Sequence, residues 1–167
     1  MRAYKFLTAE GRGVFSRFPW PLPAERPGGW VESEVDPCRS GIHACRASDL
    51  PYWTAAALYE IELEGRVEEH ALKLVAARGR LVRRVDLWNA GAQAAYGRMC
   101  VDRARELAAA APLELADWAP PADIPLEQSA RLGFIAARIA EELGGPMAYQ
   151  AERARQSAWL VGRLALD

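Results

Sequence analysis

The sequence predicts an α+β fold, with a small, strongly twisted antiparallel sheet in the N-terminal half and a helical C-terminal section packed on it. Up to residue 88, short runs of alternating apolar and polar residues are separated by proline and glycine turns, as in antiparallel strands. After residue 88, alanine becomes abundant and apolar residues recur at spacings of three and four, as in amphipathic helices. We therefore expect a β-rich section over 1–88 and a helical section over 89–167.

The β-rich section contains five segments with the composition of strands. They are 2–7, 30–35, 42–45, 58–64 and 67–85, the last as one or two strands. Gly65 is expected to end the fourth strand, and Gly79 with Arg78 to bend the fifth. The loop 19–29 holds four prolines and two glycines, so it cannot be a central strand.

Helices are expected wherever the apolar spacing becomes three and four. A short helix should begin at Ser48 as its N-cap, because serine favours that position. The longer helices are expected over 90–111, over 126–143 and from Pro146 to about 166, with a proline-rich connector over 113–125 and a C-cap at Gly144 and Gly145. The last two should form an antiparallel hairpin. The apolar seam of the last helix is expected to be Met147, Ala151, Ala154, Ala158, Val161 and Ala165.

Composition excludes several classes of protein. The 167 residues carry a net charge of −1, which gives no electrostatic reason to bind nucleic acid or a membrane surface. No apolar run approaches the ~20 residues that span a bilayer, and the N-terminus lacks a signal sequence. Three cysteines suit a reducing cytoplasm better than a disulfide framework. The excess of arginine and alanine is typical of a GC-rich genome, such as that of an actinobacterium.

The segment 36–53 concentrates the unusual chemistry of the chain. Cys38, His43 and Cys45 have the spacing C-x4-H-x-C, which matches no common structural zinc pattern, and a fourth ligand would have to be Asp36 or Asp49. We therefore expect no metal here.

His43, Cys45 and Tyr52 are the candidate catalytic residues. Residues two apart in a strand share a face, so His43 and Cys45 could act as a base and a thiolate. The alternative is that Cys45 is a small buried apolar residue. His43 is the preferred acid–base group, because the pKa of histidine lies near neutrality.

Aromatic and basic residues suggest where a ligand would bind. Trp20 and Trp53 could line an apolar pocket, although they could equally be core residues. Arg46 and Arg78 could attract an anionic part of the ligand. The arginines between 78 and 84 could instead pair with the alternating glutamates of 60–64 across one sheet.

The order of these motifs resembles the central block of the ADP-ribosyltransferase and poly-ADP-ribose polymerase fold. The resemblance rests on the segment from Gly41 to Trp53 followed by the strand that ends at Gly65. It implies that Tyr52 stacks on a nicotinamide ring and that Lys5 stands near a position that grips the dinucleotide. The family's catalytic glutamate would lie near 70–75, where this chain has Lys73.

The chain also resembles a group of uncharacterised bacterial and phage proteins that begin Tyr-Lys and carry a Gly-Phe/Ile-His-Ala-Cys motif. That second resemblance implies no reaction, and either one covers only about residues 1–85.

The function expected from these residues is that of a small-molecule enzyme with His43 as the acid–base group, and bacterial secondary metabolism is the setting we consider for it. The sequence assigns neither a cofactor nor a substrate. The alternative is a non-catalytic module that binds a ligand or another protein through its C-terminal helix pair, which could also form a homodimer.

Overall fold

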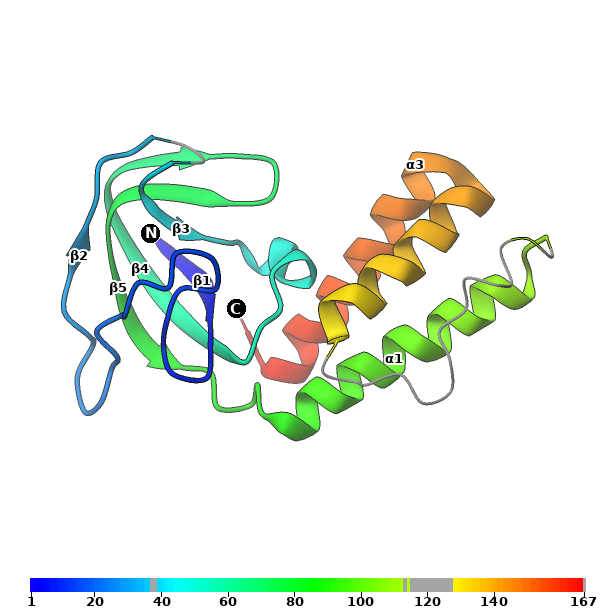
Figure 1. The fold of residues 1–167 in the computed structure, drawn as a ribbon, viewed down its shortest axis with the longest axis horizontal. Coiled ribbons are helices and arrows are strands. Elements are labelled where there is room, and N and C mark those ends of the chain that lie inside the picture. Colours follow the sequence, from blue (N-terminus) through cyan, green and yellow to red (C-terminus); the bar gives the residue numbers. More distant parts are fainter. Residues whose placement is uncertain (37–38, 113, 115–127, 167) are drawn as a thin grey trace. The chain divides into compact units, whose positions relative to one another are not determined.

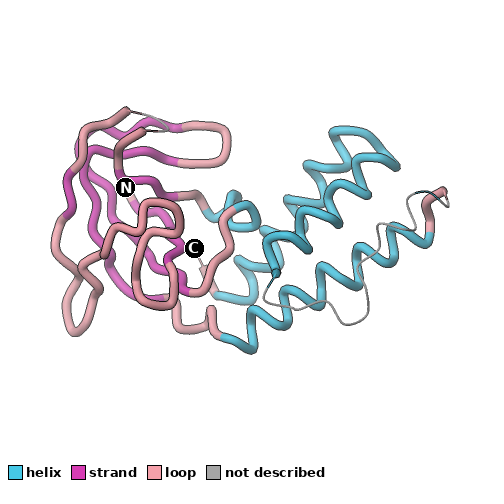
Figure 2. Tube along the Cα trace, viewed as in Figure 1, coloured by secondary structure: helices cyan, strands magenta, loops and turns pink. Residues whose placement is uncertain are grey.

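The computed structural model describes residues 1–36, 39–112, 114 and 128–166. The chain divides into two compact units, Met1–Trp88 and Asn89–Asp167, and the boundary falls where the composition changes. The first unit contains the sheet and the second contains the long helices, which confirms the α+β class (Figures 1 and 2). Within the described residues, no helix is both long enough and apolar enough to cross a bilayer.

The N-terminal unit is built on one antiparallel sheet of five strands. They are β1 (Arg2–Leu7), β2 (Val31–Glu32), β3 (Ile42–Ala44), β4 (Ala57–Glu69) and β5 (Leu74–Arg84). The strand order is β1-β4-β5-β2, and β3 also pairs with β5. An isolated bridge joins Tyr4 to Cys45, whose main chains exchange two hydrogen bonds of 2.8 and 2.9 Å. The antiparallel sheet confirms the prediction.

Alternation along the strands sends side chains to two faces. One face forms the main apolar core of the unit: Ala3, Leu7, Trp20, Ile42, Ala44, Ala57, Tyr59, Ile61, Leu63, Leu74, Ala76 and Leu81. Lys5 lies between Ala3 and Leu7 on β1 and therefore shares the core face. His43 lies between Ile42 and Ala44 and therefore points to the opposite face.

One glycine does not act as the sequence suggested, and a second lies inside a continuous strand. Gly65 was expected to end a strand, but β4 runs through it as a register shift between Glu64 and Val67. Its φ of 73° suits a bulge, which adds a residue to one strand without ending the ladder. Gly79 lies inside β5 and does not divide it, and a Cβ atom there would approach Ile42 to 2.7 Å.

The predicted short helix is a 3₁₀ helix, η1 (Ala47–Tyr52), and its N-cap is Arg46 instead of Ser48. The carboxylate of Asp49 accepts a hydrogen bond from the main-chain N–H of Arg46 at 3.4 Å and pairs with its guanidinium at 2.8 Å. The helix therefore begins two residues early because Asp49 reaches back to cap it.

The C-terminal unit consists of α1 (Ala90–Ala109) and α3 (Ser129–Leu164), and α3 doubles back on itself (Figure 1). The side chain of Asn89 caps α1 by accepting a hydrogen bond from the N–H of Ala92. Gly145 breaks α3 with a φ of 75°, and Pro146 begins its second half, as the sequence predicted. The predicted connector lies almost wholly outside the described residues.

The predicted seam of the last helix is wrong. Met147 is 79% exposed, and Ala151, Ala154 and Ala158 are exposed as well. The buried positions of this half-helix are Glu152, Arg153, Gln156, Ser157, Leu160 and Leu164. Polar side chains, and not the expected alanines, occupy the inner face because they form hydrogen bonds with one another there. A count of apolar residues cannot detect such a face.

Candidate functional site

His43 is held on the sheet face opposite the main core. It stands directly across from Val75 in the register of β3 and β5, and Lys73 precedes that partner by two residues. The side chain is half-buried, and its Nε2 atom is buried with no hydrogen-bond partner among the described residues. Burial of the imidazole, followed by the positive charges of Lys73, Lys5 and His70, lowers its pKa below the ordinary value near 6.5. The ring is therefore neutral at physiological pH.

Lys5 places an amine where β1 and β3 meet. Its Nζ atom donates a hydrogen bond to the main-chain carbonyl of His43 at 2.5 Å and lies 4.7 Å from the ring centroid of Trp20. No carboxylate among the described residues forms an ion pair with it. Burial lowers the pKa of Lys5 to about 8, because an ammonium loses its hydration there without gaining a counter-ion.

We expect the lowered pKa of Lys5 to be visible in the pH dependence of the free energy of unfolding. The pKa of Lys5 is about 8 in the folded chain and near 10.4 in the unfolded chain, so the unfolded chain binds more protons between these values. The free energy of unfolding should therefore rise with pH across that window, by roughly 2–3 kcal/mol. Lys5→Met should remove this rise in urea unfolding between pH 7 and pH 10.5. Lys73→Met should keep it, and identical profiles for wild type and Lys5→Met would contradict the assignment.

Cys45 is a poor candidate for a thiolate. Its side chain is buried, and Sγ donates to the carbonyl of Tyr4 at 3.5 Å. Burial, followed by the charge of Asp49, raises its pKa to about 12, so the thiol stays protonated at physiological pH. Cys38 lies outside the described residues. Within the residues described, no group of three or more His, Cys, Asp or Glu side chains could hold a metal ion.

Arg46 and Trp53 hold the turn between β4 and β5. The guanidinium of Arg46 donates to the main-chain carbonyls of His70 and Ala71 at 2.7 and 3.0 Å. The indole of Trp53 donates to the carbonyl of Leu72 at 2.7 Å. These donors satisfy the main chain of the turn, so an anionic ligand would have to displace contacts that Arg46 already makes.

Arg78 belongs to a charged ladder on the outer side of the β4–β5 hairpin. The register places Glu60, Glu62 and Glu64 opposite Arg83, Arg80 and Arg78, and each pair forms an ion pair. The guanidiniums of Arg78 and Arg80 also lie 4.2 and 4.5 Å from the ring centroid of Trp30. The alternating charges therefore pair across the sheet, as the structural interpretation of the sequence predicted.

The predicted aromatic residues are divided between two places. Trp20 is a core residue beside Lys5, and Phe18 packs against it edge-on at 5.8 Å. Trp53 instead meets the exposed Phe15 at 6.4 Å. Tyr52 is half-buried at the end of η1. The loop that contains Phe15 and Phe18 thus contacts both tryptophans. The candidate residues Lys5 and His43 nevertheless do not share one site, because their side chains face opposite sides of the sheet.

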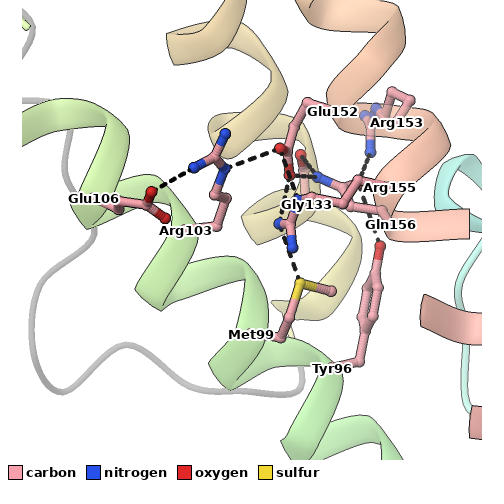
Figure 3. A network of polar contacts seen from close by, with 9 residues as sticks. All are labelled: Tyr96, Met99, Arg103, Glu106, Gly133, Glu152, Arg153, Arg155 and Gln156. Atoms are coloured by element: carbon pink, nitrogen blue, oxygen red, sulfur yellow. Dashed lines mark hydrogen bonds and ion pairs between the residues drawn. The ribbon is translucent and has the colours of Figure 1, made fainter. Parts of the chain in front are cut away.

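A polar network in the C-terminal unit was not predicted (Figure 3). Glu152, 3% exposed, accepts hydrogen bonds from Arg103, Arg155 and Gln156 at 2.7 to 3.1 Å. Gln156 also donates to the carbonyl of Gly133 at 3.0 Å, which joins the two halves of α3. Burial alone would raise the pKa of Glu152, but the hydrogen bonds and charges of its partners outweigh burial and lower it.

The network is closed on one side by Tyr96 and Arg153. Arg153 donates to the side-chain oxygen of Gln156 at 3.0 Å, and the hydroxyl of Tyr96 donates to the same oxygen at 3.5 Å. Tyr96 is fully buried, and burial raises its pKa well above the ordinary value. Because its members satisfy one another, this network is better suited to fixing how the helices pair than to reacting with a substrate.

Two shallow hollows lie on the C-terminal unit. One, of about 390 Å³, is lined by Phe134, Arg138, Glu141, Pro146, Tyr149 and Gln150. The other, of about 360 Å³, lies beside Glu152. Phe134, Leu143 and Met147 are exposed on α3, and the expected homodimer through these helices stays a prediction.

Comparison of the chain with protein-family models, with curated proteins and with solved structures found no match. The resemblance to ADP-ribosyltransferases therefore stays a prediction, as do the roles that it gives to Lys5 and Tyr52. Function must then be inferred from the chemistry of the side chains themselves.

Proposed function

We propose that the N-terminal unit is an enzyme that acts on a small molecule, with His43 as the group that accepts and returns a proton. One observation carries the proposal: Nε2 of His43 is buried and has no hydrogen-bond partner among the described residues. Nε2 of His70 also lacks a hydrogen-bond partner there, but it lies 3.6 Å from the carboxylate of Glu68. Such an atom costs free energy unless a bound molecule or water satisfies it. A neutral imidazole in that position is ready to accept a proton from a substrate.

The surroundings of His43 support acid–base chemistry more than covalent chemistry. Burial lowers the pKa of His43, and Lys73, Lys5 and His70 lower it further, which favours the basic form. Cys45 stays protonated because burial raises its pKa to about 12. We therefore assign the proton transfer to His43 and leave Cys45 without a covalent role.

The test compares the two histidines of the chain. Wild type, His43→Gln and His70→Gln would be screened for thermal shifts and tryptophan fluorescence against carboxylates, phosphorylated metabolites and NAD, which the transferase resemblance suggests. We expect at least one compound to change the melting temperature or the tryptophan fluorescence of wild type and of His70→Gln. Turnover of that compound should fall at least ~100-fold in His43→Gln. Activity should fall at acid pH, below the ordinary histidine pKa, because His43 is then protonated.

Two results would count against this proposal. The first is a wild-type protein that responds to no compound of the panel. The second is a ligand whose binding and turnover are the same in His43→Gln and wild type. A folding check by circular dichroism on each variant separates a lost site from a lost fold.

A further inference from the structure

Lys5 combines three features that a structural lysine seldom shares. Its amine lies on the core face of β1 and meets one acceptor among the described residues, the carbonyl of His43. It has no ion-pair partner among those residues, although buried ammonium groups are usually paired. The residue as a whole nevertheless keeps intermediate exposure, so part of its side chain is reached by solvent, although burial lowers the pKa of the amine.

The side chain of Lys5 links β1 to the main chain of β3. An isolated bridge between Tyr4 and Cys45 joins β1 to the segment after β3. Next to this bridge, the side chain of Lys5 spans from β1 to the carbonyl of His43 and rests on the ring of Trp20. The flat indole leaves the amine beside an apolar wall, which suits a planar, uncharged group such as a carbonyl compound.

We propose that Lys5 is a nucleophilic amine that forms an imine with small aldehydes or ketones bound against Trp20. The neutral amine attacks the carbonyl carbon, a C–N bond forms, and the carbonyl oxygen takes a proton to give a carbinolamine. Loss of one water molecule then leaves the C=N bond, so no oxidant or reductant is needed. The low pKa of Lys5, about 8, supplies the neutral amine near physiological pH.

The imine site goes beyond the acid–base proposal and does not depend on it. The imidazole of His43 lies on the other face of the sheet, and only its main-chain carbonyl touches the amine. His43→Gln should therefore form the imine as wild type does, so the two proposals can fail separately.

The composition makes the test specific, because Lys5 and Lys73 are the only lysines. The folded protein would be treated with benzaldehyde and cyanoborohydride at pH 7, which fixes each imine as a benzylamine. Peptide mapping would then compare Lys5, Lys73 and the α-amino group with the ε-amine of N-acetyl-lysine amide in the same tube. At pH 7 an amine of pKa about 8 is neutral on the order of 100 times more often than an ordinary lysine amine.

We expect Lys5 to be labelled on the order of 100-fold faster than the reference amine, with a rate that levels off above pH 8. Lys73→Arg should keep this labelling, and Lys5→Arg should lose it. Labelling of Lys5 no faster than that of Lys73 or of the reference would overturn the proposal. The wild-type map decides alone if Lys5→Arg does not fold.

Discussion

Trp88→Ala is expected to lower the free energy of unfolding of the N-terminal unit by about 3–5 kcal/mol, as removal of a large buried aromatic residue does. The indole is 1% exposed and meets Phe6 edge-on at 5.8 Å. Its N–H donates to the carbonyl of Ala55 at 2.8 Å. Alanine would leave both a cavity and a carbonyl without this donor, and the two costs add.

Two variants separate these costs when urea unfolding is monitored by circular dichroism. Trp88→Phe keeps a ring against Phe6 but lacks the donor to Ala55, so it should lose less than Trp88→Ala. Trp53→Ala also removes an indole donor, but from a half-buried side chain, and should lose less again. A loss below about 1 kcal/mol in Trp88→Ala, within the range of surface substitutions, would show that the indole is not a core residue.

Glu152→Ala should destabilise the C-terminal unit far more than an ordinary surface substitution does. It would leave Arg103, Arg155 and Gln156 without the carboxylate they share. Removing one member of a buried ion pair costs about 3–5 kcal/mol. Because the side chains of Arg103 and Arg155 are 28% and 40% exposed and can turn to water, we expect a loss of about 2–3 kcal/mol.

The control for Glu152 is Glu142→Ala on the same helix. Glu142 pairs with Arg138 at the surface, so its removal should cost less than ~1 kcal/mol. The pKa of Glu152 is lowered in the folded chain, so its contribution is complete above the unfolded value near 4.3 and is lost as pH falls through the folded pKa. Equal losses in both variants, or a Glu152 effect that persists unchanged at strongly acid pH, would contradict this assignment.

Local signals were enough to predict most strands and one helix break. The aromatic alternation of β1 and the Gly145–Pro146 pair depend on neighbours in the sequence, and both appear where expected. The prediction that Gly65 ends a strand was wrong because a glycine can either end a strand or form a bulge within it. Only its pairing across to β5 decides between these outcomes.

The site and the polar network depend on partners far apart in the sequence. Lys5 and the carbonyl of His43 are 38 residues apart, and Arg103 and Glu152 are 49 residues apart. The sequence identified Lys5 and His43 as candidates, but it could not show that their side chains face opposite sides of the sheet. Glu152 and Gln156 gave no signal, because polar residues on a helix are ordinarily solvent-facing.

The matched glutamates and arginines of β4 and β5 have a consequence for how this hairpin finds its alignment. A slip of one residue would turn Ile61 and Leu63 toward water, since side chains alternate between faces. The same slip would separate Glu62 from Arg80, and the other charged pairs with it. Misaligned pairings of these two strands are thus penalised through solvation and through charge at once, and the native alignment is singled out by residues close together along the chain.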